Sequence, residues 1–165
     1  MQFAASDGKA VTLNEPKPTP CSECPWRVGN WGKTDTDNDE FYTPQRRFQM
    51  WDSHPDRRAG TGVRHGTTMV CHQGAPCEAG GCKDGSTVAY ECTGARILVD
   101  RELWWFHGEG KPAPGGLTLN GIARVIQNRF GLSVERFRAL SRPEVRAKLH
   151  DGIGDGEISR GPYVA

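Results

Sequence analysis

The chain has 165 residues, a hydrophobic content of 36% and a formal net charge of +1. That length suits one domain with a modest core, and the balanced charge excludes a global electrostatic field directed at nucleic acid or membrane. The 21 glycines and 11 prolines predict long loops. A small core with long loops usually needs disulfides or a metal for stability.

The N-terminal segment, residues 1–20, is polar and carries three prolines near its end. It lacks the basic start and continuous apolar run of a secretory signal peptide. No apolar run of the chain approaches the length of a bilayer span. We therefore expect a cytoplasmic protein without a membrane partner, and an extended N-terminal tail over residues 1–20.

All six cysteines and all five tryptophans lie within residues 21–110, which we interpret as a Cys-rich metal-binding module. Thr43 before Pro44 predicts the start of a helix that includes Phe48 and Trp51. Residues 66–72 resemble a short strand that runs into Cys71, and residues 74–86 form a glycine-rich loop. The next stretch is either a strand and a helix or a hairpin. We prefer a helix capped by Thr93.

Residues 111–116 have the composition of a linker, and residues 117–165 are expected to form a helical segment of the same domain. Apolar residues at helical spacing predict a first helix over 119–130, and Gly131 is well placed to end it. A second helix follows from Ser133. Ser141 with Glu144 three residues later is a capping-box pattern, which predicts a third helix to about residue 150.

The sequence CSECPWR places Cys21 and Cys24 in one tight turn, which is the usual way for half of a structural zinc site to begin. In a cytosolic chain, six cysteines favour metal binding or catalysis over a disulfide framework. A thioredoxin-like redox pair is disfavoured, because Glu23 lies between the thiols and the proline-rich approach cannot form a buried strand. An iron–sulfur cluster, which also uses four thiolates, stays open as an alternative to zinc.

Several residues downstream can supply the second pair of ligands. Cys71 lies at the end of the expected strand, and Cys92 lies just before the expected helix, whose dipole favours a thiolate. The cysteines at positions 77 and 82 lie in the glycine-rich loop, where ordering around a metal costs entropy.

The cysteine pattern resembles a family of small actinobacterial and actinophage proteins that share a domain of unknown function. That family has CxxCP followed by an aromatic residue and Arg, then Cys-His, then Cys-x-Gly. The matching residues in this chain are Cys21, Cys24, Pro25, Trp26, Arg27, Cys71, His72, Cys92 and Gly94. The match covers residues 20 to 106, and the resemblance implies a metal-binding fold with no assigned activity.

With this resemblance, we expect the metal ligands to be Cys21, Cys24, Cys71 and Cys92, with His72 as the replacement if one cysteine is not used. The family has an aromatic residue where this chain has Ala95, so the choice of Cys92 over Cys82 stays open. Trp26 is expected to pack beside the metal.

Cys77 and Cys82 have two interpretations. They are either surface thiols or, with His65 or His72, the ligands of a second metal site. An enzyme that uses a metal or thiol at Cys71 and His72 is an alternative function, although no metal-hydrolase spacing such as HExxH is present.

Residues 121–150 carry an excess of basic side chains and have the organisation of a helix-turn-helix, which is an alternative DNA-binding function. The candidate DNA-contacting residues are Arg129, Arg136, Arg138 and Arg142. An amphipathic helical hairpin packed on the metal module is the simpler interpretation.

Taken together, the sequence predicts an α+β fold: a small loop-rich domain stapled by zinc, with a C-terminal helical segment. The favoured function is a non-enzymatic binding module whose unknown partner is a protein or a nucleic acid. Whether the chain is an enzyme stays open from sequence, with the balance against it.

Overall fold

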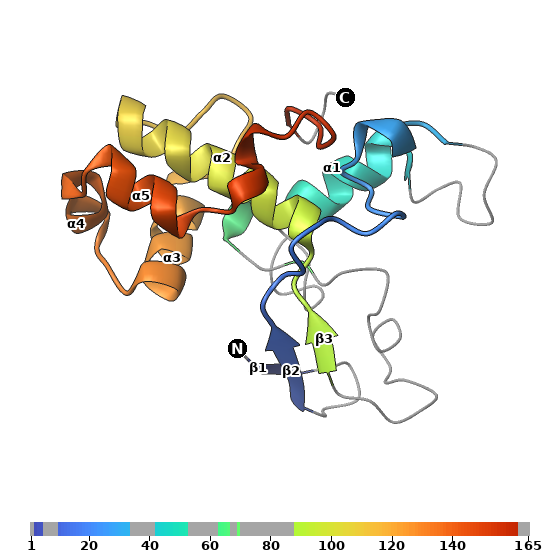
Figure 1. Ribbon diagram of the computed structural model, residues 1–165, viewed down its shortest axis with the longest axis horizontal. Coiled ribbons are helices and arrows are strands. Elements are labelled where there is room, and N and C mark those ends of the chain that lie inside the picture. Colours follow the sequence, from blue (N-terminus) through green and yellow to red (C-terminus); the bar gives the residue numbers. More distant parts are fainter. Residues whose placement is uncertain are drawn as a thin grey trace.

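The computed structural model describes residues 2–4, 10–33, 42–52, 63–66, 69 and 88–161. The longest helix, α2 (Thr93–Glu109), lies at the centre of the structure (Figure 1). Three helices gather at one end of α2: α3 (Leu119–Phe130), α4 (Val134–Ala139) and α5 (Arg142–Lys148). Helix α1 (Pro44–Asp52) lies toward the other end. The short 3-10 helices are η1 (Val28–Asn30), η3 (Val63–His65) and η4 (Asp151–Gly154).

The C-terminal helices begin and end at local signals that the sequence carries. Gly131 adopts a left-handed conformation at the end of α3, with φ of 63°, as its position predicted. Ser133 caps α4, and Ser141 caps α5 by accepting a hydrogen bond from the backbone of Glu144. The Ser141 hydroxyl also donates to the Glu144 carboxylate, so the predicted pairing of these two residues is confirmed.

Three short strands pair beside the start of α2 (Figure 1). Strand β2 (Ala10–Asn14) lies between β1 (Gln2–Ala4) and β3 (Val88–Tyr90), antiparallel to the former and parallel to the latter. Part of the expected N-terminal tail is therefore paired with the segment that leads into α2. The strand-and-helix interpretation of residues 88–109 is confirmed over the hairpin.

The predicted α+β class is wrong, because the structure is predominantly helical. Its apolar core comes from helices and loops: every core residue whose burial is described lies outside the three strands. The largest fully buried apolar side chains are Trp26, Trp51, Ile97, Leu103, Phe106, Leu117, Ile122, Ile126, Phe137 and Ile158. The short strands pair with one another. Glycine and proline counts indicated loops correctly, but they do not distinguish a helical core from a sheet.

One local expectation also needs correction. Thr93 does not cap α2; the cap is Cys92, and the Thr93 hydroxyl donates to the carbonyl of Lys17 at 2.8 Å. Phe48 is 46% exposed, whereas Arg47 on the same helix is fully buried. Helical spacing gives the periodicity of a face, but which face packs inward depends on tertiary contacts.

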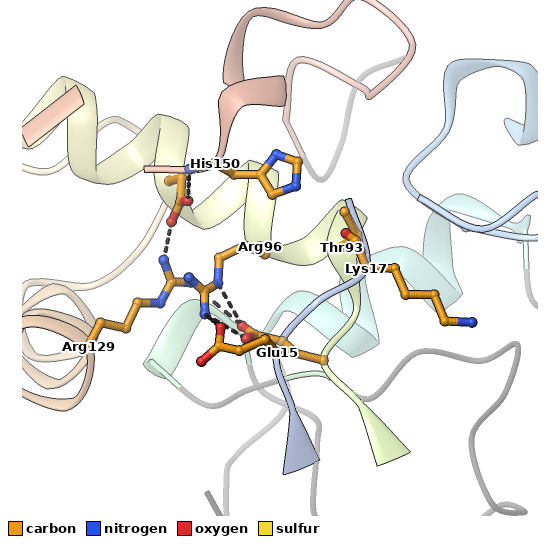
Figure 2. A network of polar contacts seen from close by, with 8 residues as sticks. Glu15, Lys17, Thr93, Arg96, Arg129 and His150 are labelled. Atoms are coloured by element: carbon orange, nitrogen blue, oxygen red, sulfur yellow. Dashed lines mark hydrogen bonds and ion pairs between the residues drawn. The ribbon is translucent and has the colours of Figure 1, made fainter. Parts of the chain in front are cut away.

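A network of charged side chains joins α2 to the segments around it (Figure 2). The carboxylate of Asp100, which is fully buried on α2, accepts from the Arg129 guanidinium and from the backbone N–H of His150. Arg96 pairs with Glu91 at 2.7 Å, just before the start of α2. These contacts tie α3 and the segment after α5 to the central helix.

Candidate metal centre

The turn that carries Cys21 and Cys24 is fixed by side chains that bind its carbonyl groups. Asn30 donates to the carbonyl oxygens of Ser22 at 2.9 Å and Cys24 at 2.8 Å. Arg27 donates through Nε to the Cys21 carbonyl at 2.8 Å. Within the turn, the Cys24 N–H donates to the Cys21 carbonyl at 3.1 Å. The backbone between the two cysteines is therefore held by donors that do not involve the thiols.

The thiol of Cys24 meets the thiol of Cys92 at the N-terminus of α2. Both residues are buried, with 1% and 2% exposure. A hydrogen bond between the two thiols lowers the pKa of Cys24, while burial and the nearby Cys21 oppose that effect. Cys92 is the N-cap residue of α2, so its position before a helix was predicted correctly. Three of the four predicted ligands thus belong to one neighbourhood.

The Cys-x-Gly sequence has a steric explanation here. A Cβ atom at Gly94 would overlap the Sγ of Cys24 and would lie 3.1 Å from Cδ1 of Trp26. The absence of a side chain at position 94 therefore lets the turn approach the first turn of α2. Trp26 is fully buried and, like the Sγ of Cys24, lies against Gly94, whereas its predicted place beside a metal stays a prediction.

Two arginines contribute positive charge to this neighbourhood. Arg47 is fully buried and lies 3.9 Å from the centre of the Trp31 ring. It donates to the Ser159 hydroxyl and the Arg27 carbonyl, which are both neutral, and its Nε has no hydrogen-bond partner. Burial lowers the pKa of Arg47 to about 10, and the charge of Cys24 opposes this shift. Arg27 lowers the pKa of Cys24.

The remaining predicted ligands fall outside the described residues: Cys71, His72, Cys77 and Cys82, together with the side chain of His65. Within the described part of the chain, no group of three or more His, Cys, Asp or Glu side chains is arranged to hold a metal ion. One backbone contact bears on Cys71. The N–H of Cys92 donates to the carbonyl of Met69 at 2.7 Å. Met69, which is two residues before Cys71 in the sequence, therefore lies beside Cys92.

Sequence reasoning did not identify Asn30 or Arg47 as parts of this neighbourhood. Asn30 lies in η1, and nothing in the sequence distinguished it from an ordinary loop residue. Arg47 follows Arg46 in a helix where arginine usually faces water. An arginine between buried residues of α1 becomes recognisable only when its tertiary partners are known.

The four candidate DNA-contacting arginines occupy different environments. Arg129 is engaged by Asp100 and Glu91, and burial lowers its pKa. Arg142 lies 3.3 Å from the centre of the Trp104 ring and donates to the Trp104 carbonyl. Arg136 and Arg138 are exposed. The structure therefore does not present the four as one surface, and DNA binding by residues 121–150 stays a prediction.

No family model, curated protein or solved structure matches the chain. In the part of the chain that the structure describes, no helix combines the length and apolar character needed to cross a lipid bilayer.

Proposed function

We propose that the protein binds one zinc ion through Cys21, Cys24, Cys71 and Cys92, and that the ion joins the CxxC turn to the start of α2. The observation that carries the proposal is the convergence of Cys24 and Cys92, which lie far apart in the sequence. Zinc prefers tetrahedral thiolate sites of this kind, with two ligands in one turn and two from elsewhere in the chain.

The charge of the surroundings supports bound thiolates. A zinc ion with four thiolates carries a net charge of about −2. Arg47 is a fully buried cation whose hydrogen-bond acceptors are both neutral. A buried charge needs compensation, and an anionic metal centre near Cys24 would provide it.

An unsatisfied hydrogen-bond donor gives a second argument. The indole N–H of Trp26 is buried without a partner among the described residues. Its neighbouring ring atom Cδ1 and the Sγ of Cys24 both lie against Gly94. Buried donors are normally satisfied, and metal-bound thiolates accept hydrogen bonds that tune the site.

Chain connectivity favours Cys71 as the fourth ligand. The Met69 carbonyl is held against the backbone of Cys92 at 2.7 Å. Two residues of chain span at most about 7 Å, a length that allows Cys71 to supply a ligand to the same ion. His72 is the replacement ligand, and Cys77 and Cys82 are left for a second site or for the surface. Four protein ligands complete the coordination of the proposed ion, so no coordination position is left for a substrate.

A closed site of this kind is structural, which favours a non-enzymatic binding module over an enzyme that uses Cys71 and His72. The partner belongs to either the protein or the nucleic-acid class. This function fits the resemblance to the actinobacterial and actinophage family, and we place the protein in the cytoplasm, where thiols stay reduced.

The test is elemental analysis of the full chain, purified without added metal. We expect one zinc per chain. Iron together with a brown absorbance would indicate an iron–sulfur cluster instead of zinc. Protein that folds without any metal would contradict the proposal. An Arg47→Gln variant should bind zinc about 10-fold more weakly in competition with a chelator, because it removes compensating charge. Arg46→Gln, at a half-buried position where the guanidinium donates to Gln49 of the same helix, is its matched control.

A further inference from the structure

The C-terminal strap, residues 151–161, follows α5 and is anchored on α2 by the side chain of Arg101. The guanidinium group donates to four carbonyl oxygens of the strap at 2.5 to 3.2 Å, those of residues 153, 155, 158 and 159. Arginine has five N–H groups in a fixed planar arrangement, so one side chain can bind several carbonyls at once. The only regular element of the strap is η4. Its conformation therefore depends on contacts with the rest of the protein.

On its other side, the C-terminal strap pairs with the residues that leave the CxxC turn. The N–H of Val28 donates to the carbonyl of Glu157 at 2.9 Å, and the N–H of Ser159 donates to the carbonyl of Trp26 at 2.8 Å. These two bonds flank an antiparallel bridge. Ser159 is fully buried in this arrangement. The strap therefore connects α2 with the backbone that directly follows the two cysteines.

Two further arginines connect the strap with the CxxC turn. Arg27 pairs with the Glu157 carboxylate at 2.8 Å and donates to the Cys21 carbonyl at 2.8 Å. Arg47 donates to the Ser159 hydroxyl at 3.2 Å and to the Arg27 carbonyl at 3.3 Å. A displacement of the strap would therefore remove a partner from each of these arginines.

We propose that Arg101 is a positioning residue of the zinc site, because through the C-terminal strap it holds the CxxC turn in the arrangement that binds the ion. This inference rests on the proposed zinc site and adds to it a part of the chain that contains no cysteine. A turn that is already held in place loses less conformational freedom when its thiolates bind a metal. The coupling is reciprocal: if the docked strap raises zinc affinity, bound zinc favours the docked strap by the same factor.

The zinc affinity of Arg101→Gln, measured on the full chain in competition with a chelator, is the first test. Glutamine has two N–H donors and cannot bind the four carbonyls. We expect the variant to bind zinc about 10-fold more weakly, as is usual when a group that supports a metal ligand is removed. Zinc binding as tight as in the wild-type protein would overturn the proposal.

Arg142→Gln is the matched control. Arg142 also donates to a backbone carbonyl, that of Trp104, and lies over the Trp104 ring, but toward the C-terminal end of α2. The control variant should lose stability and bind zinc like the wild-type protein. An equal loss of zinc affinity in both variants would show that general destabilisation, and not the strap, weakens the site. Circular dichroism on both variants shows whether they are folded.

Amide hydrogen exchange of the wild-type chain, followed by NMR, is a second test that depends on no variant. Reciprocal coupling predicts that chelation of zinc accelerates exchange of the Val28 and Ser159 amides by about 10-fold. The amides of α5, which directly precedes the strap, should keep their protection. Unchanged exchange at both Val28 and Ser159, in a chain that binds zinc, would overturn the proposal.

The outcomes separate this inference from the zinc site itself. A wild-type chain that contains no zinc overturns both proposals. A wild-type chain with one zinc, together with unchanged zinc affinity in folded Arg101→Gln, overturns the positioning role of Arg101 and leaves the zinc site in place.

Discussion

Different kinds of interaction hold the rest of the protein against the two ends of α2. At its N-terminus, the CxxC turn meets the helix through the thiols of Cys24 and Cys92 and through the close approach to Gly94. Near its C-terminus, α4 and α5 pack through apolar side chains such as Phe137 and Val145, and their own capping residues define them. The first region depends on contacts between distant residues, whereas the second is largely specified locally. We expect the two regions to respond differently to the loss of metal.

The largest expected effect is that of chelation. Removal of the proposed zinc ion should accelerate amide hydrogen exchange in residues 21–33 and in the first turn of α2, because structural metal binding supplies about 10–16 kcal/mol in small zinc domains. Amides of α4 and α5 should keep most of their protection. Hydrogen exchange resolved by mass spectrometry measures this difference. Uniform loss of protection along the chain, or none at all, would show that the two regions are not distinct in this way.

The same contrast explains what the sequence could predict. The C-terminal helices follow from Gly131, Ser133 and Ser141, whose effects extend over one turn. Two parts of the candidate metal site could also be predicted from the sequence: the CxxC turn and the position of Cys92 just before a helix. The burial of Arg47 and the fold class depend on contacts between distant segments, which no local pattern contains. The short apolar runs of the sequence therefore predict an α+β fold, whereas the core is formed by helices and loops.

The next effect concerns the network of charged side chains that joins α2 to the segments around it. Asp100→Asn should destabilise the protein by about 3 kcal/mol, because the largely buried Arg129 loses the carboxylate of Asp100 and keeps Glu91, at 3.7 Å, as a more distant partner. Denaturant unfolding provides the measurement. Asp151→Asn is the control, since its side chain is 98% exposed and an exposed ion pair contributes about 0–1 kcal/mol. Similar losses in the two variants would mean that burial of Asp100 is not what makes the network stabilising.

Gly94→Ala tests the close approach of the turn to α2. The new methyl group would overlap the Sγ of Cys24, and overpacking of this kind costs about 1–3 kcal/mol. Zinc affinity should fall together with thermal stability. Gly29→Ala, close to the same turn, is the matched control because nothing lies within 4 Å of its added Cβ. A Gly94→Ala variant with a normal melting temperature and normal zinc affinity would show that the proposed site does not depend on this glycine.

A smaller effect is expected from Glu102. Its folded-state pKa is raised from 4.5 to about 7, so its contribution to stability is fully present below pH 4.5 and is lost as pH rises through about 7. Glu102→Gln should therefore reduce the decline in stability between pH 4.5 and 7.5. Chemical unfolding at a series of pH values checks this. An unchanged pH profile would assign the titration to other groups.

The central claim is that Cys92 shares one metal ion with the CxxC turn. The most direct test is the zinc content of Cys92→Ser beside Cys82→Ser, each purified under the same conditions without added metal. The account predicts that Cys92→Ser loses the zinc and that Cys82→Ser keeps one zinc per chain. Retention of zinc by Cys92→Ser, with its loss in Cys82→Ser, would contradict the account.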